Sequence, residues 1–108
     1  MTPIKLVQGD SLPYIYLSLT AAVSGQPIDV SDESVTVRLR FRATGTADVL
    51  STLVCEKSDP AQGRVRFGFA GGVLDVSPGT YEGEIEIDFD GQIETLYDTL
   101  KFIVRAQF

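Results

Sequence analysis

The 108-residue sequence contains no histidine, no tryptophan and a single cysteine, Cys55. One cysteine leaves no internal disulfide and no multi-cysteine metal site. Without histidine, Cys55 has no imidazole partner for a catalytic dyad, so we expect it to be a buried, inert thiol. We expect no cofactor and no bound metal. A single cysteine is also more typical of a protein that assembles in a reducing cytoplasm than of a secreted module held together by disulfides.

Positive charge is also scarce. The chain has 9 basic and 15 acidic residues, which gives a formal net charge of −6. Binding to nucleic acid needs a clustered positive surface, so we expect no nucleic-acid partner. No apolar run has the length of a signal peptide or a membrane span, so we expect no membrane association. Residues 1–108 are predicted to form one domain, which is large enough to bury a core.

The most informative stretch is 78–95. From Tyr81 to Phe89 the odd positions are apolar or glycine, and the even positions are acidic. Because successive side chains of a strand point to opposite faces, this pattern predicts one buried face and one acidic face. Asp90 and Gly91 then supply the residues of a tight hairpin turn. The stretch therefore predicts a long, half-buried strand followed by a hairpin; its acidic residues are Glu82, Glu84, Glu86 and Asp88.

Shorter apolar or alternating segments occur along the rest of the chain. The clearest is 35–42, where Val35, Val37, Leu39 and Phe41 are expected to point inward. Segment 49–56 is predicted to be a strand, but its register is ambiguous because its apolar residues do not alternate. Segment 57–63 is predicted to be a polar loop. Seven or eight short strands with polar turns, and no helical period, predict an all-β sandwich or barrel. The other predicted strands are Ile4–Val7, 14–20, 64–69 and Leu100–Arg105.

Two matched rows of charge refine this prediction. The outward face of 35–42 carries Arg38, Arg40 and Arg42, and the outward face of 81–89 is acidic. Neighbouring strands would turn these two repelling rows into cross-strand ion pairs, each contributing a few tenths of a kcal/mol to roughly 1 kcal/mol. In immunoglobulin-like sandwiches the third and sixth strands are neighbours. The charges favour that pairing, although two separately solvated rows remain an alternative.

The segment before the acidic strand gives a second indication. Asp75 precedes Gly79 and Tyr81, and the predicted strand begins at the tyrosine. This arrangement resembles the corner before the sixth strand of immunoglobulin-like domains, where the tyrosine hydroxyl bonds to upstream backbone. The disulfide and core tryptophan of antibody domains are missing. We therefore predict an immunoglobulin-like antiparallel β-sandwich of seven to eight strands, with Tyr81 as its corner residue.

Nothing in the sequence predicts catalysis. The acidic row is the densest cluster of reactive groups, but neighbours on one strand face share one environment and make a poor acid–base pair. A flat strand also presents carboxylates in a line, whereas Ca²⁺ needs convergent oxygens. We expect a solvated or arginine-paired face, no catalytic residues and no enzyme. Tyr14 and Tyr16 are candidate interface residues, because tyrosine is enriched at interfaces, but half-buried sheet packing explains them equally well.

The order of turns and strands resembles one known family. The segments that carry the resemblance are 7–13 (Val-Gln-Gly-Asp-Ser-Leu-Pro), 25–30, 35–42, 63–67, 78–84 (Pro-Gly-Thr-Tyr-Glu-Gly-Glu), 89–92 and 94–95. Together they are similar to the immunoglobulin-like domain at the N-terminus of phage baseplate upper proteins. Each motif alone is turn chemistry that any β domain might use, and the shared order carries the likeness.

The resemblance implies a non-catalytic structural component of a tailed-phage virion. Such a protein would assemble in the host cytoplasm and bind other virion proteins through sheet edges and loops, in many symmetric copies. Its position would be in the tail or baseplate, with the neck or the capsid surface as further options. The alternative is a free-standing adhesion module that binds a host-surface glycan, using exposed aromatic residues such as Tyr14, Tyr16 and Tyr97.

Overall fold

The computed structural model describes residues 2–108 and contains nine β-strands and one short 3₁₀ helix, Pro60–Gln62, in that part of the chain. No helix within those residues is long and apolar enough to span a membrane. The strands are β1 (Ile4–Val7), β2 (Ile15–Ser18), β3 (Val35–Ala43), β4 (Ser51–Val54), β5 (Glu56–Asp59), β6 (Arg64–Phe67), β7 (Gly79–Phe89), β8 (Gln92–Thr95) and β9 (Leu100–Arg105).

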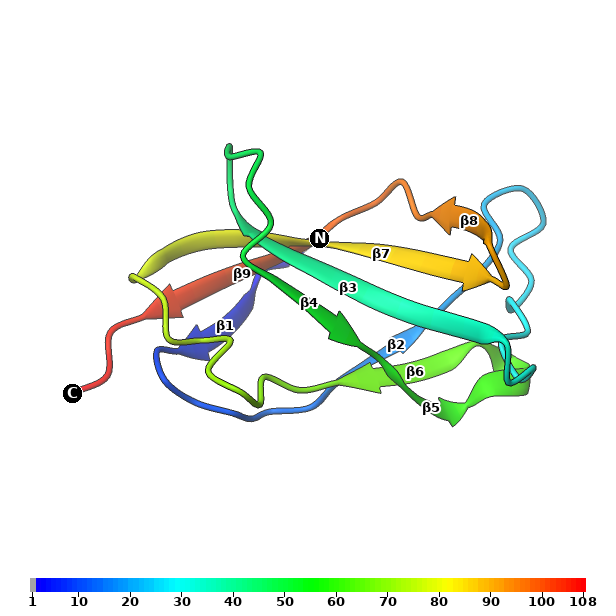
Figure 1. Ribbon diagram of the computed structural model, residues 1–108. Helices are drawn as coiled ribbons and strands as arrows, with labels where there is room; N and C mark the ends of the chain where they lie inside the picture. The colour runs from blue at the N-terminus through cyan, green and yellow to red at the C-terminus, as the bar shows by residue number, and fades with distance from the viewer. Residues whose placement is uncertain (1) are drawn as a thin grey trace.

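The strands form two packed sheets, which confirms the predicted all-β sandwich (Figure 1). The larger sheet has the order β1-β9-β7-β3-β4, and the smaller sheet has the order β2-β6-β5. The predicted acidic strand, β7, lies at the centre of the larger sheet. It pairs with β3 along one side and with β9 and then β8 along the other.

One strand pair departs from the predicted antiparallel pattern. β1 pairs in parallel with β9, with Ile4 opposite Phe102 and Val7 opposite Arg105. Antiparallel neighbours can be joined by a short hairpin, but the chain leaves β1 for β2 in the other sheet and returns much later. No local turn therefore fixes the direction of β1 relative to β9.

The predicted strand 49–56 is wrong as a single element. β4 ends at Val54 in the larger sheet, and β5 begins at Glu56 in the smaller one, so the chain changes sheets at Cys55 (Figure 1). Residues 57–59, predicted as part of a loop, belong to β5, which pairs with β6. This division raises the strand count from the predicted seven or eight to nine. Cys55 is buried, as expected, because the crossing passes between the sheets.

The core lies between the inner faces of both sheets. Alternate residues of β3, β6, β7 and β9 are buried there, and the predicted inward sides of β3 and β7 are confirmed. Phe102 of the larger sheet packs against Phe67, the last residue of β6, and against Phe69, with ring centroids 6.4 and 6.1 Å apart. Gly83 is required at its inward position, because a Cβ there would lie 2.6 Å from Leu39 Cδ1.

The hairpin after β7 forms at the predicted residues. Asp90 and Gly91 both adopt positive φ, at 55° and 101°, as a tight two-residue hairpin turn requires. Asp88 Oδ1 accepts a hydrogen bond of 2.7 Å from the Gly91 backbone N–H. This bond lowers the pKa of the Asp88 carboxyl, and the Arg38 side chain adds to the effect.

Candidate functional site

The charged face of the larger sheet brings the two predicted rows side by side. In the register of β3 and β7, Arg38 lies opposite Glu86, Arg40 opposite Glu84, and Arg42 opposite Glu82. All these side chains project from the outer face, since their neighbours along each strand are buried in the core. The sheet therefore carries a basic row next to an acidic row on its solvent side.

Glu86 receives two arginines at the centre of this face. Its Oε2 lies 2.9 Å from Arg40 Nη2, and its Oε1 lies 3.3 Å from Arg38 Nη1. Arg38 also reaches Asp88 Oδ2 at 3.3 Å. Glu86 is the one charged residue among 2–108 that is buried, with 7% of its surface exposed. Burial of a carboxylate is tolerated when opposite charges and hydrogen bonds compensate for lost water.

Glu82 forms the second ion-pair centre. Its Oε1 accepts a 2.7 Å hydrogen bond from Arg42 Nε, and its Oε2 accepts one of 3.0 Å from Lys101 Nζ. These bonds, first that of Lys101 and then that of Arg42, lower the pKa of the Glu82 carboxyl. The sequence prediction did not include Lys101. The alternation of Leu100, Phe102 and Val104 nevertheless indicates that Lys101 lies on the outward side of β9.

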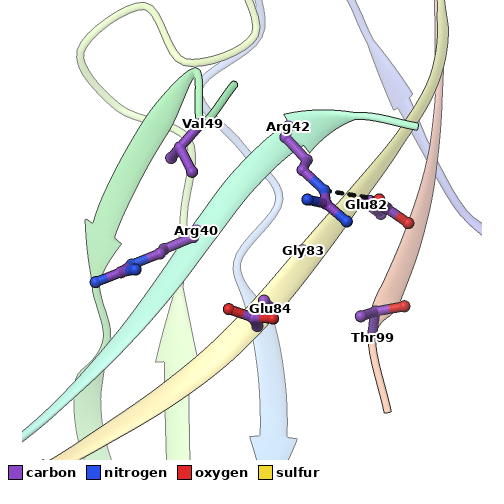
Figure 2. A pocket seen from close by; sticks show the side chains of 7 residues that line it. All are labelled: Arg40, Arg42, Val49, Glu82, Gly83, Glu84 and Thr99. Atoms are coloured by element: carbon purple, nitrogen blue, oxygen red, sulfur yellow. Dashed lines mark hydrogen bonds and ion pairs between the residues drawn. The ribbon is translucent and has the colours of Figure 1, made fainter. Parts of the chain in front are cut away.

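Glu84 stands apart from both centres. It is exposed, and within residues 2–108 it makes no ion pair with any basic side chain. It lines a shallow depression with Arg40, Arg42, Val49, Glu82, Gly83 and Thr99 (Figure 2). Arg40, its register partner, binds the diagonal neighbour Glu86 instead. The two carboxylates of the depression, Glu82 and Glu84, project side by side from one strand face and do not face each other across a cleft, as the acid and base of a hydrolase do.

Tyr81 lies at the predicted corner. Its hydroxyl donates a hydrogen bond to the Ser77 backbone carbonyl four residues upstream. Its ring stacks on Phe41, with centroids 5.1 Å apart and planes inclined by 8°. The side chain is buried, so the hydroxyl forms its hydrogen bond with this carbonyl in place of water. The contact joins the start of β7 to the segment that enters it.

Tyr14 and Tyr16 lie on the outer side of the smaller sheet, gathered around Arg66. The Arg66 guanidinium lies 4.2 Å from the centre of the Tyr14 ring, and its Nη1 donates to Tyr16 Oη at 3.3 Å. Glu56 Oε2 accepts a 3.0 Å bond from Arg66 Nη2. The Tyr16 bond and then the Glu56 bond raise the pKa of Arg66. Sequence reasoning missed Arg66 and Glu56, which belong to strands it did not pair.

Three further titratable groups, Cys55, Asp29 and Asp32, lie in the core or in turns. Burial raises the pKa of the Cys55 thiol to about 12, which keeps it protonated and unreactive at neutral pH. Asp29 and Asp32 accept bonds from the backbone and side chains of Ser31 and Ser34, and these bonds lower the pKa of each carboxyl. Over residues 2–108, no three His, Cys, Asp or Glu side chains converge as a metal site requires.

Known proteins provide one useful comparison. No protein-family model matches the sequence, and no curated protein does. Among solved structures, the fold matches the N-terminal domain of ORF48 of phage TP901-1 with a TM-score of 0.61. The match covers 96% of this chain and 85% of that one, with 17% sequence identity. At this identity the likeness establishes a shared fold.

Proposed function

We propose that this protein is a non-catalytic structural component of a tailed-phage virion and acts through protein–protein contacts. The observation that carries the proposal is the backbone match, over 96% of the chain, to the N-terminal domain of a phage protein. We place the protein in the tail or baseplate, among other virion proteins. The neck and the capsid surface are the other positions at which such a domain would serve.

The arrangement of the charged groups supports a structural role. Of the seven ion pairs among residues 2–108, five lie on the β3, β7 and β9 face, where they link neighbouring strands. Such pairs add rigidity to a sheet but leave no free acid and base facing one another across a cleft. A rigid sandwich presents loops at its ends and strand edges at its sides, and strand edges bind other chains by backbone pairing.

Mass spectrometry of purified particles tests the proposal. Virions of the phage or prophage that encodes the protein would be separated on a density gradient, and each fraction would be digested and quantified. We expect the protein to co-sediment with the major tail and capsid proteins. A host cytoplasmic protein of similar abundance serves as the control for carry-over. Abundant protein in the lysate with none in the particles would reject a virion role.

A glycan array with the intact domain tests the adhesion alternative. Arg66 covers one face of the Tyr14 ring, whereas the Tyr16 ring is 64% exposed and only its hydroxyl contacts that arginine. Tyr97 is fully exposed, so Tyr16 and Tyr97 are the rings on which a sugar would have to stack. We expect no specific signal. A specific glycan signal that is lost on Tyr16→Ala or Tyr97→Ala would favour adhesion over assembly.

A further inference from the structure

The exposed edges of the two sheets differ in how they are protected against pairing with another strand. Natural edge strands avoid such pairing with charges, prolines, bulges or a covering segment. β1 follows Pro3 and carries Lys5 at its centre, and β8 carries Glu94. β5 is charged along most of its length, with a register shift between Lys57 and Asp59, and is followed by Pro60.

β2 and β4 are the two uncharged edges. Ser18 of β2 shares a surface groove with Glu94 and Asp98, so carboxylates lie beside the end of that strand. β4 reads Ser51-Thr52-Leu53-Val54, with no charge and no proline. Val54 is 66% exposed, and the preceding Val49 and Leu50 are 48% and 51% exposed. β4 is therefore the least protected edge among residues 2–108.

The backbone of β4 leaves hydrogen-bonding groups open at this edge. Cys55 donates its N–H to Val37 of β3. Bonded residues alternate along an antiparallel strand, so Ser51 and Leu53 also face β3, while the backbone groups of Thr52 and Val54 point away from it. Leu50 donates to Phe41 O although Ser51 is the register partner of Phe41. Two residues thus oppose one, as in a β-bulge, and regular pairing begins at Ser51.

We propose that β4 pairs with β4 of a second copy of this chain, antiparallel about a two-fold axis at Leu53. Thr52 would then lie opposite Val54 of the second copy, and Val54 opposite its Thr52. The open backbone groups of both residues would be satisfied, and the two larger sheets would join into one. This inference stands independently of the proposed function.

Charge favours a second copy as the occupant. In a two-fold interface the same patch meets itself, so a charge near the axis would face its own copy. Thr52, Leu53 and Val54 are uncharged, and Thr and Val are favoured in strands. The chain carries −6, so two copies repel wherever carboxylates meet. At β4 the nearest charged row is that of Arg38, Arg40 and Arg42, which is already paired with carboxylates of β7.

Sedimentation velocity over a roughly hundredfold range of protein concentration tests the pairing. We expect a monomer–dimer equilibrium for the full chain, with no weakening as salt is raised, because no charges meet across the seam. Thr52→Lys should leave a monomer at every concentration, because a lysine on the edge blocks strand addition. Thr80→Lys makes the same change on the same sheet face away from β4, and should still dimerise. Circular dichroism and melting would verify that both variants are folded.

A second variant tests the register. Thr52→Lys combined with Val54→Glu would place a lysine opposite a glutamate of the second copy twice. This double variant should dimerise again, and salt should now weaken its dimer. A wild-type chain that stays monomeric throughout would overturn the proposal and leave the β4 edge for a strand of a different protein. A dimer that survives Thr52→Lys would also overturn it, since the contact would lie on another face.

Discussion

Both the ring and the hydroxyl of Tyr81 make contacts at the start of the central strand, β7. The ring stacks on Phe41 of the neighbouring strand, and the hydroxyl bonds to the Ser77 carbonyl. The Tyr81 side chain is buried although Ser77 is exposed, so this bond holds the hydroxyl where little water reaches it. The value of the tyrosine over a phenylalanine at this position therefore lies in the hydroxyl.

Tyr81→Phe isolates that contribution. We expect a loss of about 1 kcal/mol in the free energy of unfolding, because the ring packing is kept and one partly buried hydrogen bond is removed. The measurement is the urea denaturation midpoint of both proteins. Tyr97→Phe removes a hydroxyl from a fully exposed ring and should leave the midpoint unchanged. Equal midpoints for Tyr81→Phe and the wild type would mean that the corner bond adds no stability.

Glu82 gives the fold a dependence on pH. Lys101 and Arg42 lower the pKa of its carboxyl in the folded state. A lowered folded-state pKa adds stability that is complete above the unfolded-state pKa and is lost as the pH falls through the folded-state value. Glu82→Gln should therefore cost about 1 kcal/mol at neutral pH, where both ion pairs exist, and progressively less in acid.

Denaturant titrations of the wild type and Glu82→Gln at several pH values would measure this difference. Glu84→Gln is the matched control on the same strand face, since Glu84 forms no ion pair within residues 2–108. The Glu84 variant should differ little from the wild type at any pH. A gap between wild type and Glu82→Gln that is the same at neutral and acid pH would contradict the assigned ion pairs.

At the scale of elements, the charge pattern of β3 and β7 carried more information than any motif. The two complementary rows pointed to neighbouring strands, and the structure pairs them over nine residues of β3. The individual contacts were less accessible to sequence reasoning. Arg40 lies opposite Glu84 but binds Glu86, because a long side chain on a twisted sheet reaches the diagonal neighbour. Strand register follows from pattern, whereas the choice among partners depends on side-chain conformation.

A double-mutant cycle distinguishes the diagonal pair from the opposite pair. Arg40→Gln and Glu86→Gln should couple by roughly 0.5 kcal/mol at low salt, and the coupling should fall as salt is added. Arg40→Gln with Glu84→Gln should couple less. Unfolding free energies of the single and double variants at two salt concentrations provide the measurement. Stronger coupling to Glu84 than to Glu86 would mean that Arg40 takes the directly opposite partner in solution.

The change of sheets at Cys55 shows where sequence patterns stop being informative. Segment 49–56 is apolar enough to be a strand, but its residues do not alternate. The structure gives two reasons: two residues oppose Phe41 near the start of β4, and Cys55 passes between the sheets into β5. Each event shifts the phase of the inward side chains. Alternation identifies the buried face of a strand, but not the sheet to which the strand belongs.

At the scale of the whole molecule, the two sheets share one aromatic core. Phe102 of β9 contacts Phe41 in its own sheet, at 5.5 Å between centroids, and Phe67 and Phe69 across the interface. Gly83 of β7, which lies opposite Leu100, leaves room for the Phe102 ring, since a Cβ there would lie 3.0 Å from Phe102 Cε2. Because neither sheet can bury its inner face alone, they should unfold together. The alternation of 35–42 predicted Phe41 as inward-facing, but which rings meet in the core depends on how the sheets are stacked.

Phe102→Ala tests this shared core. Removing a buried ring that both sheets contact should lower the free energy of unfolding by about 3–5 kcal/mol, because apolar burial is lost and a cavity remains. Phe108→Ala makes the same change on a fully exposed ring and should cost little. Far-ultraviolet circular dichroism would follow the strands, and near-ultraviolet circular dichroism the aromatic packing, through the same urea titration. We expect the two signals to change in one coincident transition for both variants. Loss of aromatic packing at a lower urea concentration than loss of strands would mean that the sheets separate before they unfold.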